Sequence, residues 1–261
     1  MNYEPRRRLI LSMGISLGLA LASLHAGADT TQPPLKFYAE PFPPFSYEEN
    51  GNPAGPLVEV VQAVCHSARL PCVIEIIPWR RIMKLADAGL LDGVCMVARI
   101  PEREQVFFIT DDVALSSFTF FTQQGSQFKY RLPHDLNGST IGVYGPSGTS
   151  ATLEELNKDA GARVELEVDN VTALRKLAAG RYGDRGAILI NRDVARVLVA
   201  ENGIEGVVAA GDAKIISYAI GLSRATMDVH RAELFNAKLR ALKRAGVVRG
   251  ILQKHGIAAA P

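Results

Sequence analysis

Strand-like and helix-like segments alternate along two parts of this sequence, and that alternation is the feature that most constrains its fold. Short β-branched or apolar runs, typical of buried strands, are separated by segments with apolar residues at helical spacing. The strand patterns cover residues 35–39, 72–77, 92–97, 139–144, 163–168 and 187–190, and the helix patterns cover 56–68, 79–89, 149–159, 170–180 and 191–202. Repeated alternation of this kind predicts an α/β fold with a largely parallel sheet.

Two long extended stretches, residues 113–126 and 214–223, interrupt the alternation, and helix patterns at 226–244 and 246–255 close the chain. We therefore predict two α/β lobes joined by two extended hinge strands. The predicted division is lobe 1 at residues 29–120, lobe 2 at 121–217 and a return to lobe 1 at 218–261. Ligands of open α/β sheets bind outside the carboxyl ends of strands, so two facing lobes form a cleft that can close around a ligand.

Residues 1–28 have the pattern of a secretory signal peptide that is removed from the mature protein. Three arginines at positions 6–8 precede an apolar run at residues 9–24, and the small residues at 26–28 offer a cleavage site before Asp29. A membrane anchor is the alternative, but about 20 apolar residues are needed to span a bilayer. We therefore expect a protein that is exported to the periplasm.

The net charge of the mature chain argues against two classes of partner. The full chain has 29 basic and 27 acidic residues, and residues 1–28 contain three arginines and Glu4, so the mature chain is formally neutral. A neutral chain offers no electrostatic attraction to nucleic acid or to an anionic membrane surface. We expect a soluble monomer that binds neither.

Three cysteines, Cys65, Cys72 and Cys95, occur in the chain. Disulfides form in exported proteins, and a bridge from Cys65 at the end of a helix pattern to Cys72 at the start of a strand pattern would fasten the turn between them. Cys95 lies in an apolar run and is predicted to be a buried free thiol. The spacing C-x6-C without a nearby pair of histidines is not a zinc signature, and we predict neither a metal nor a cofactor.

The segment 145–150, Gly-Pro-Ser-Gly-Thr-Ser, follows a strand pattern and opens a helix pattern. No lysine follows Gly148 as a P-loop requires, the glycines do not match a dinucleotide fingerprint, and the G-x-S-x-G of esterases is incomplete. Ser147 and Thr149 are good N-cap residues, and the free N–H groups of a helix start favour a carboxylate or small oxyanion. The alternative is that these hydroxyls only cap the helix.

Two arginines follow the strand pattern that ends near residue 97, where the cleft is expected. Arg99 and Arg103 each carry a guanidinium that can bind a carboxylate through two parallel hydrogen bonds. A surface ion pair with Glu102 or Glu104 is the alternative.

Aromatic residues also lie at the expected rim of the cleft. Prolines hold Phe42, Phe45 and Tyr47 in a stiff segment directly after the first strand pattern, and Trp79 begins a helix pattern. Rigid rings in these places can wall a ligand pocket or cover the end of the core.

The order of these motifs resembles that of the family 3 periplasmic solute-binding proteins, which supply polar amino acids to ABC importers. The matching segments are Phe42-Pro43-Pro44-Phe45, Gly55 with Glu59, Gly89 to Asp92, Ile100-Pro101-Glu102-Arg103, Phe108, and residues 135–143, 148–149, 174–181, 218–223 and 245–256. The resemblance covers residues 35–256. It implies a type II periplasmic-binding-protein fold, a function without catalysis, and the inner-membrane permease of an ABC importer as partner.

The resemblance also implies roles for individual residues. Arg103 matches the arginine that grips the α-carboxylate of the ligand, and Gly148 and Thr149 match a second-lobe loop that adds donors to the same carboxylate. Phe42 matches an aromatic residue that packs on the ligand. We add as further ligand-binding candidates Ser147, Phe45, Trp79, Arg99 and Asn191.

Two places depart from the family pattern and bear on the ligand. Residues 98–100, Ala-Arg-Ile, stand where a serine or threonine helps to hold the amino group. Asn191 stands where an aspartate pairs with the ammonium, with Asp193 two residues later. An asparagine cannot neutralise an ammonium, and Arg99 attracts a second carboxylate. An α-amino acid, a dicarboxylate, an acylated amino acid and another organic acid therefore all remain open as ligands.

Two other functions are compatible with the same scaffold. A dehydratase-like enzyme needs a general acid or base in the cleft, for which Glu40 and Glu59 are the nearest candidates. A ligand sensor would act through a separate protein partner. The leading prediction is a binding protein that delivers a small carboxylated solute to an ABC importer.

Overall fold

The computed structural model describes Met1 and residues 33–99 and 101–261. The predicted signal peptide, residues 1–28, therefore lies outside the described residues apart from Met1. Residues 33–261 form one compact unit. Among the helices of this part of the chain, none is long and apolar enough to cross a membrane.

The centre of this unit is a nine-stranded sheet with the strand order β4-β1-β5-β10-β6-β9-β7-β8, in which β11 also pairs with β6. Strands β4, β1 and β5 are parallel, as are β9, β7 and β8, whereas β10 and β6 between them are antiparallel to each other. The bounds are β1 Leu35–Ala39, β4 Cys72–Ile76, β5 Gly93–Ala98, β6 Phe107–Gln123, β7 Thr140–Tyr144, β8 Arg163–Glu167, β9 Gly186–Asn191, β10 Val207–Ser223 and β11 Ala258–Ala259. Strands β2 (Tyr47–Glu49) and β3 (Asn52–Ala54) form a separate hairpin.

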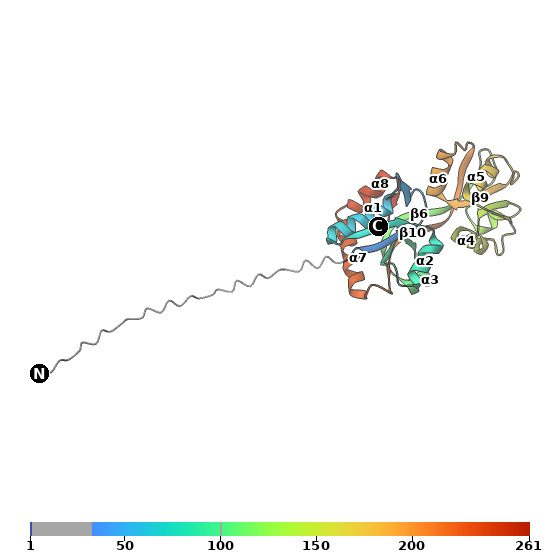
Figure 1. Ribbon diagram of the computed structural model, residues 1–261. Coiled ribbons are helices and arrows are strands. Elements are labelled where there is room, and N and C mark those ends of the chain that lie inside the picture. Colours follow the sequence, from blue (N-terminus) through green and yellow to red (C-terminus); the bar gives the residue numbers. More distant parts are fainter. Residues whose placement is uncertain (2–32, 100) are drawn as a thin grey trace. The chain divides into compact units, whose positions relative to one another are not determined.

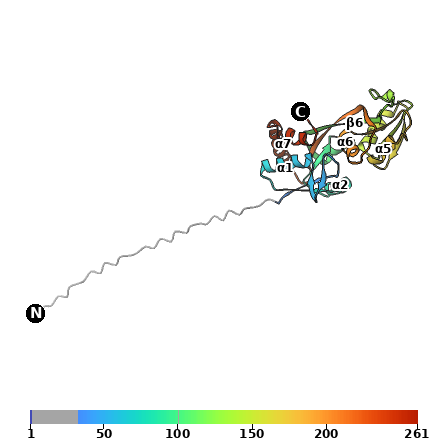
Figure 2. The ribbon, with the colours of Figure 1, turned by 90° about the horizontal axis from the view of Figure 1, so that it is seen from above.

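Helices cover each group of parallel strands and so define two lobes, with β6 running between them (Figure 1, Figure 2). Lobe 1 contains β1, β4 and β5 with α1 (Pro56–Ala68), α2 (Trp79–Asp87), α3 (Pro101–Val106), α7 (Val229–Arg244) and α8 (Val247–Lys254). Lobe 2 contains β7, β8 and β9 with α4 (Gly148–Asn157), α5 (Asn170–Ala178), α6 (Arg192–Glu201) and the 3-10 turn η1 (Pro133–Leu136). The predicted fold class is confirmed. The predicted lobe boundaries after residues 120 and 217 fall inside β6 and β10 and stay a prediction.

The register of the central pair brings the carboxyl ends of β5 and β9 together. Ala98 at the end of β5 pairs with Tyr218 of β10, which pairs with Ala114 of β6. Asn191 at the end of β9 pairs with Phe118 of β6. The two parallel groups therefore point toward each other and end within a few residues of one another along β6, which is where α/β sheets bind ligands.

The apolar side chains whose spacing predicted helices and strands form the hydrophobic core. In α1 the apolar side chains at helical spacing are buried, among them Leu57, Val61 and Val64. Phe37 of β1 is fully buried and stacks on Phe235 of α7 with 5.6 Å between ring centroids. Full burial of such a side chain stabilises the fold by roughly 1.5–3 kcal/mol. A second cluster, built around Phe120, Ile141, Val143 and Leu153, lies in lobe 2.

The segment that follows β5 differs from the prediction. We expected a loop after residue 97 and an extended stretch only from residue 113, but α3 occupies residues 101–106 and β6 already begins at Phe107. Proline is favoured at the first position of a helix, and Glu102 and Glu104 lie at its N-terminal end, where the helix dipole favours negative charge. Arg103 is therefore carried by a short helix rather than by a loop.

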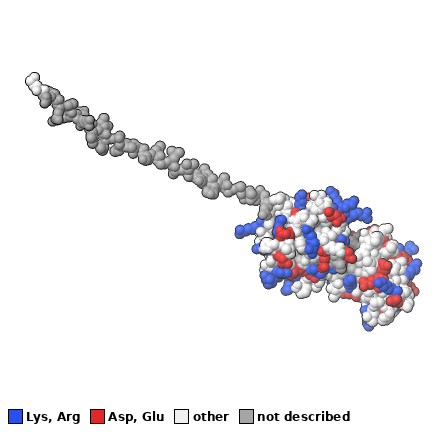
Figure 3. Space-filling model, turned by 90° about the horizontal axis from the view of Figure 1, so that it is seen from below, with Lys and Arg blue, Asp and Glu red and all other residues white. Residues whose placement is uncertain are grey.

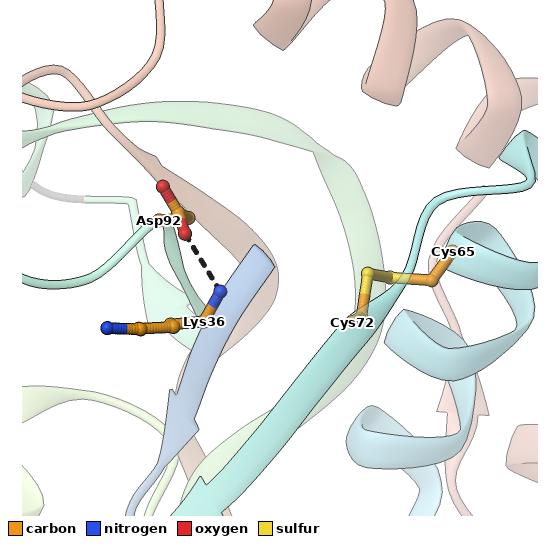
Figure 4. Close-up of a disulfide and its surroundings, with 4 residues drawn as sticks. All are labelled: Lys36, Cys65, Cys72 and Asp92. Atoms are coloured by element: carbon orange, nitrogen blue, oxygen red, sulfur yellow. Dashed lines mark hydrogen bonds between the residues drawn. A yellow bond between two sulfur atoms is a disulfide. The ribbon is translucent and has the colours of Figure 1, made fainter. Parts of the chain in front are cut away.

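The predicted disulfide is confirmed. Cys65 in the last turn of α1 bonds to Cys72 at the start of β4, with 6.2 Å between their Cα atoms (Figure 4). Cys95 of β5 is a buried free thiol, as predicted, and burial raises its pKa. The same view shows the backbone N–H of Lys36 donating a 2.8 Å hydrogen bond to the carboxylate of Asp92, which ties β1 to the residue before β5.

We expect the double variant Cys65→Ala/Cys72→Ala to be less stable than the wild type. The bridge joins residues seven positions apart. Without it the unfolded chain gains conformational entropy, which lowers the free energy of unfolding by about 2–3 kcal/mol. Scanning calorimetry should show a Tm lower by roughly 5–10 °C. A reductant should lower the Tm of the wild type only. Equal Tm values for the wild type and the double variant would contradict this prediction.

Candidate functional site

Tyr218 of β10 lies where the carboxyl ends of β5 and β9 converge. Its side chain is buried, and its ring packs edge-on against Phe45 and Phe42 with centroid distances of 5.0 and 6.4 Å. Its hydroxyl oxygen accepts a 3.1 Å hydrogen bond from the Nδ2 of Asn191. Tyr218 therefore joins the aromatic segment that follows β1 in lobe 1 to the residue that ends β9 in lobe 2.

The hydroxyl of Tyr218 is held in its neutral form. Burial raises its pKa most strongly, and the nearby carboxyl groups of Glu40 and Asp193 raise it further, although the hydrogen bond from Asn191 acts in the opposite direction. A neutral hydroxyl can still donate a hydrogen bond. Two carboxyl groups, one from each lobe, thus act on one hydroxyl at the junction of the lobes.

Asn191 is the N-cap of α6. Its Oδ1 accepts hydrogen bonds from the backbone N–H groups of Asp193 (2.9 Å) and Val194 (3.1 Å) and from the hydroxyl of Ser116 (3.2 Å). Its Nδ2 donates one hydrogen bond to Tyr218, and the side chain is buried. The structure therefore gives Asn191 a clear role in fixing α6, and a role in contacting the ligand stays a prediction.

Asp193 carries the lobe 2 carboxylate at this junction. It is only 7% exposed, and its Oδ2 accepts a 2.6 Å hydrogen bond from Ser116. It forms no ion pair with the cationic side chains of residues 33–99 and 101–261. Asp193 lies in the first turn of α6, where the helix dipole favours a negative charge, so the helix N-terminus and the hydroxyl of Ser116 stabilise its carboxylate.

Arg103 is positioned by α2. Its guanidinium carbon lies 4.6 Å from the ring centroid of Trp79, and its Nη1 lies 3.4 Å from the sulfur of Met83. Stacking on an aromatic face fixes the plane of a guanidinium while leaving its N–H groups available. Arg103 is half-buried, and no carboxylate of the described residues lies within ion-pair distance of it. It can therefore accept an anion.

Glu40 follows directly on β1 and is half-buried. Burial raises the pKa of its carboxyl group to about 7, although the positive charge of Arg103 lowers it. The backbone carbonyl of Glu40 accepts a 2.7 Å hydrogen bond from Ser46, which holds the aromatic segment against the end of β1. Glu40 is thus an ionisable group at the lobe 1 side of the junction.

The N-terminus of α4 is capped by its own loop. The hydroxyl of Ser147 accepts a 3.1 Å hydrogen bond from the N–H of Ser150 and donates one of 2.7 Å to the carbonyl of Tyr144. Ser147 therefore caps the helix, as the alternative interpretation of this segment predicted. The N–H groups of Gly148 and Thr149 donate to no acceptor in the described residues, and Gly148 is exposed. These two N–H groups remain available for an anion.

Two of the predicted ligand residues have other partners. Arg99 donates to the carbonyl of Thr110 (2.7 Å) and forms ion pairs with Glu104 (3.6 Å) and Asp112 (3.4 Å), so the predicted alternative of a surface ion pair holds for it. Phe45 is fully buried and packs on Phe42 with 5.7 Å between centroids. It supports Phe42 rather than facing solvent.

Basic and acidic side chains are interspersed on the face of the molecule seen in Figure 3, and neither sign of charge dominates that face.

Glu59 of α1, which we considered as an acid or base, lies 2.6 Å from the ring nitrogen Nε2 of His255. Tyr218, Ser116 and Asp193 were not selected from the sequence as ligand residues. Their proximity depends on the pairing of β6 with β10, which no local pattern reveals.

We expect Asn191→Ala to lower the free energy of unfolding by about 1–3 kcal/mol, because it removes an N-cap and leaves buried partners without hydrogen bonds. Urea denaturation monitored by circular dichroism measures this. Asn137, an exposed asparagine in lobe 2, provides the control. Asn137→Ala should change stability by less than about 0.5 kcal/mol. Equal stability of both variants would contradict the capping role.

Known proteins are similar to this chain over most of its length. In Bacillus subtilis (strain 168), the "Probable amino-acid-binding protein YxeM" is 23% identical over 215 residues, which is 81% of this chain and 79% of that protein. The arginine-, lysine-, histidine-binding protein ArtJ from Geobacillus stearothermophilus has a similar structure, with a TM-score of 0.67, 20% identity, and coverage of 86% of this chain and 95% of that one. A histidine kinase sensor domain with similarity to periplasmic binding proteins matches with a TM-score of 0.71, 19% identity, and coverage of 88% and 99%.

These solved structures share the fold, a type II periplasmic-binding-protein architecture of two lobes. The model of the "Bacterial extracellular solute-binding proteins, family 3" matches residues 35–257. That family consists of solute-binding proteins rather than enzymes. Because its model spans nearly all of the described residues, this chain belongs to the family 3 bacterial extracellular solute-binding proteins.

Proposed function

We propose that this protein captures a small carboxylated solute, an amino acid or a related organic acid, between its two lobes, with Arg103 as the main contact to the carboxylate. The observation that carries the proposal is the state of Arg103. Its guanidinium is fixed by Trp79 and Met83 but is not neutralised by a carboxylate of the described residues. A fixed, half-buried cation beside converging strand ends is suited to bind a carboxylate through two hydrogen bonds.

The N-terminus of α4 supplies the contact from lobe 2 in this proposal. The N–H groups of Gly148 and Thr149 and the hydroxyl of Thr149 would donate to the same carboxylate, and the helix dipole favours its negative charge. No hydrogen bond or ion pair joins Arg103 to these residues in the described part of the chain. The solute itself would therefore bridge the two lobes, while Phe42 and Trp79 provide apolar walls.

Binding is proposed to be coupled to closure. Bending within β6 and β10, near residues 119–124 and 216–221, would bring α4 toward Arg103, and a solute that contacts both lobes stabilises the closed form. The closed monomer would then dock on the inner-membrane permease of an ABC importer. The family is extracellular by description, and we place this protein in the periplasm after removal of residues 1–28.

A sensory role is the second candidate. The fold is shared with a histidine kinase sensor domain at a TM-score of 0.71, so the same closure could report the solute to a separate signalling partner. Fold alone does not decide between delivery and sensing. Both roles require the same Arg103-dependent binding.

A thermal-shift screen of residues 29–261 tests the proposed solute class. An acid present at about 100 times its Kd should add about 2.7 kcal/mol of stability and raise the Tm by roughly 5–10 °C. Arg103→Ala should weaken its binding about 100-fold, since a charge-assisted contact is lost. Arg99→Ala is the matched control, because Arg99 lies four residues away and already pairs with Glu104 and Asp112. It should change affinity by less than about threefold.

The comparison of the two arginines decides the outcome. A shift with an acid that survives in Arg103→Ala would contradict the carboxylate contact. Equal losses in both variants would mean that the effect is not specific to Arg103.

Small-angle X-ray scattering tests the proposed closure. The radius of gyration of the wild type should fall when the acid found in the screen is added, because the lobes approach each other. Arg103→Ala should show no change at the same concentration. A wild-type protein that binds the acid with an unchanged radius of gyration would contradict closure.

A further inference from the structure

Lobe 1 contains a second pocket, which none of the residues proposed to contact the solute lines. We call it the basic pocket and define it by its four cationic side chains, Arg240, Lys243, Arg244 and Arg249. The rest of its lining consists of Asp111, Val248, Ala259, Ala260 and Pro261. Its volume is about 390 Å³, within the range of small-molecule sites. Because Val248 and Ala260 are buried, packed core residues form part of its wall.

The side chains that line the basic pocket carry an excess of positive charge. Four are cationic and only Asp111 is acidic, so their net charge is +3. The whole chain has 29 basic and 27 acidic residues, so composition alone does not explain this excess. On α7, Arg240 lies three positions before Lys243 and four before Arg244, and like charges at these spacings repel each other. An anion in the pocket would offset the repulsion.

Two of the four cations are held by contacts within the chain. Arg240 donates to both carboxylate oxygens of Asp111, at 2.9 and 3.1 Å. This interaction is the main reason that the pKa of Asp111 falls to about 2, so the carboxyl group is ionised and already has its partner. Lys243 donates to the backbone carbonyls of Asp112 and Pro261, at 2.6 and 2.8 Å, which fixes the position of its ammonium group.

The other two cations, Arg244 and Arg249, have no such partner. Both are exposed, and neither forms an ion pair with a carboxylate of the described residues. The dipole of α7 favours a cation in its last turn, which accounts for Arg244 alone. Arg249 lies in the first turn of α8, where the dipole disfavours a positive charge. A bound anion would stabilise both guanidinium groups.

We propose that the basic pocket binds a phosphate group, either free phosphate or the terminal phosphate of a small molecule or lipid. The guanidinium groups of Arg244 and Arg249 would donate to its oxygens. Lys243 would add its third N–H, since an ammonium group has three donors and two are in use. Donors from two helices suit a tetrahedral group with several charged oxygens, whereas a carboxylate presents two oxygens in one plane. The site does not depend on the proposed function.

Isothermal titration calorimetry of residues 29–261 in a phosphate-free buffer tests the proposal, with inorganic phosphate, glycerol 3-phosphate and glycerol as probes. We expect a phosphate-bearing probe to bind and glycerol not to bind. Arg244→Gln and Arg249→Gln should each weaken binding about tenfold or more, because each removes charge-assisted hydrogen bonds. Arg231→Gln, which changes an exposed arginine at the other end of α7, is the matched control and should bind as the wild type.

Thermal unfolding shows whether the variants remain folded. Arg244 and Arg249 are exposed and have no ion-pair partner among the described residues, so their replacement should not lower the Tm without ligand. The phosphate-bearing probe that binds should raise the Tm of the wild type and of Arg231→Gln. At the same concentration it should raise the Tm of Arg249→Gln less.

Cosedimentation with vesicles distinguishes a soluble phosphate from a lipid headgroup. The probes are phosphatidylcholine vesicles with and without phosphatidic acid, which carries a terminal phosphate. Calorimetric binding of inorganic phosphate or glycerol 3-phosphate identifies a soluble ligand. Cosedimentation with the phosphatidic acid vesicles alone, lost in Arg249→Gln, identifies a headgroup.

Three results would overturn the proposal. The first is that neither soluble phosphate nor the phosphatidic acid vesicles bind. The second is binding that persists undiminished in both Arg244→Gln and Arg249→Gln. The third is phosphate binding that is lost in Arg103→Ala and retained in Arg249→Gln, which would assign the anion to the proposed solute site. We expect Arg103→Ala to bind phosphate as the wild type does, so failure of either proposal leaves the other intact.

Discussion

The antiparallel pairing of β6 with β10 is the interaction on which the rest of the structure depends. Each strand is 17 residues long, and on its other edge β10 pairs with β5 of lobe 1 and β6 pairs with β9 of lobe 2. Their register sets β5 and β9 pointing toward each other, so that side chains following these strands meet near Tyr218. A slip by one residue would turn every side chain of the pair to the opposite face and disperse the junction.

The two sides of that junction have different character. Around Tyr218 the hydroxyl oxygen accepts a hydrogen bond from Asn191, and the rings of Phe42 and Phe45 pack against the tyrosine ring. Around Arg103 and the start of α4, donors remain without acceptors among the described residues. The packed residues around Tyr218 thus lie beside donors that have no acceptor. Such preformed donors position a ligand, and closure of the lobes adds the remaining contacts to it.

Local sequence patterns were sufficient to predict the fold. They could not predict which residues from distant segments contact each other. Apolar spacing located the strands and helices, and the positions of Cys65 and Cys72 at the two ends of one turn predicted their bond. The pattern missed α3, because a six-residue helix begun by a proline has too few apolar positions to show a period. The partners of Arg99 and the hydrogen bond between Asn191 and Tyr218 arise from contacts between distant segments. Motif resemblance selected Arg103, but its lack of a counterion could be seen only in three dimensions.

A crystal structure of residues 29–261 with the acid identified by screening is the most direct test of the account. The account predicts a closed molecule in which the solute carboxylate lies within hydrogen-bond distance of the Arg103 guanidinium and of the N–H groups of Gly148 and Thr149. A solute bound elsewhere, or bound between the lobes without contact to Arg103, would contradict it.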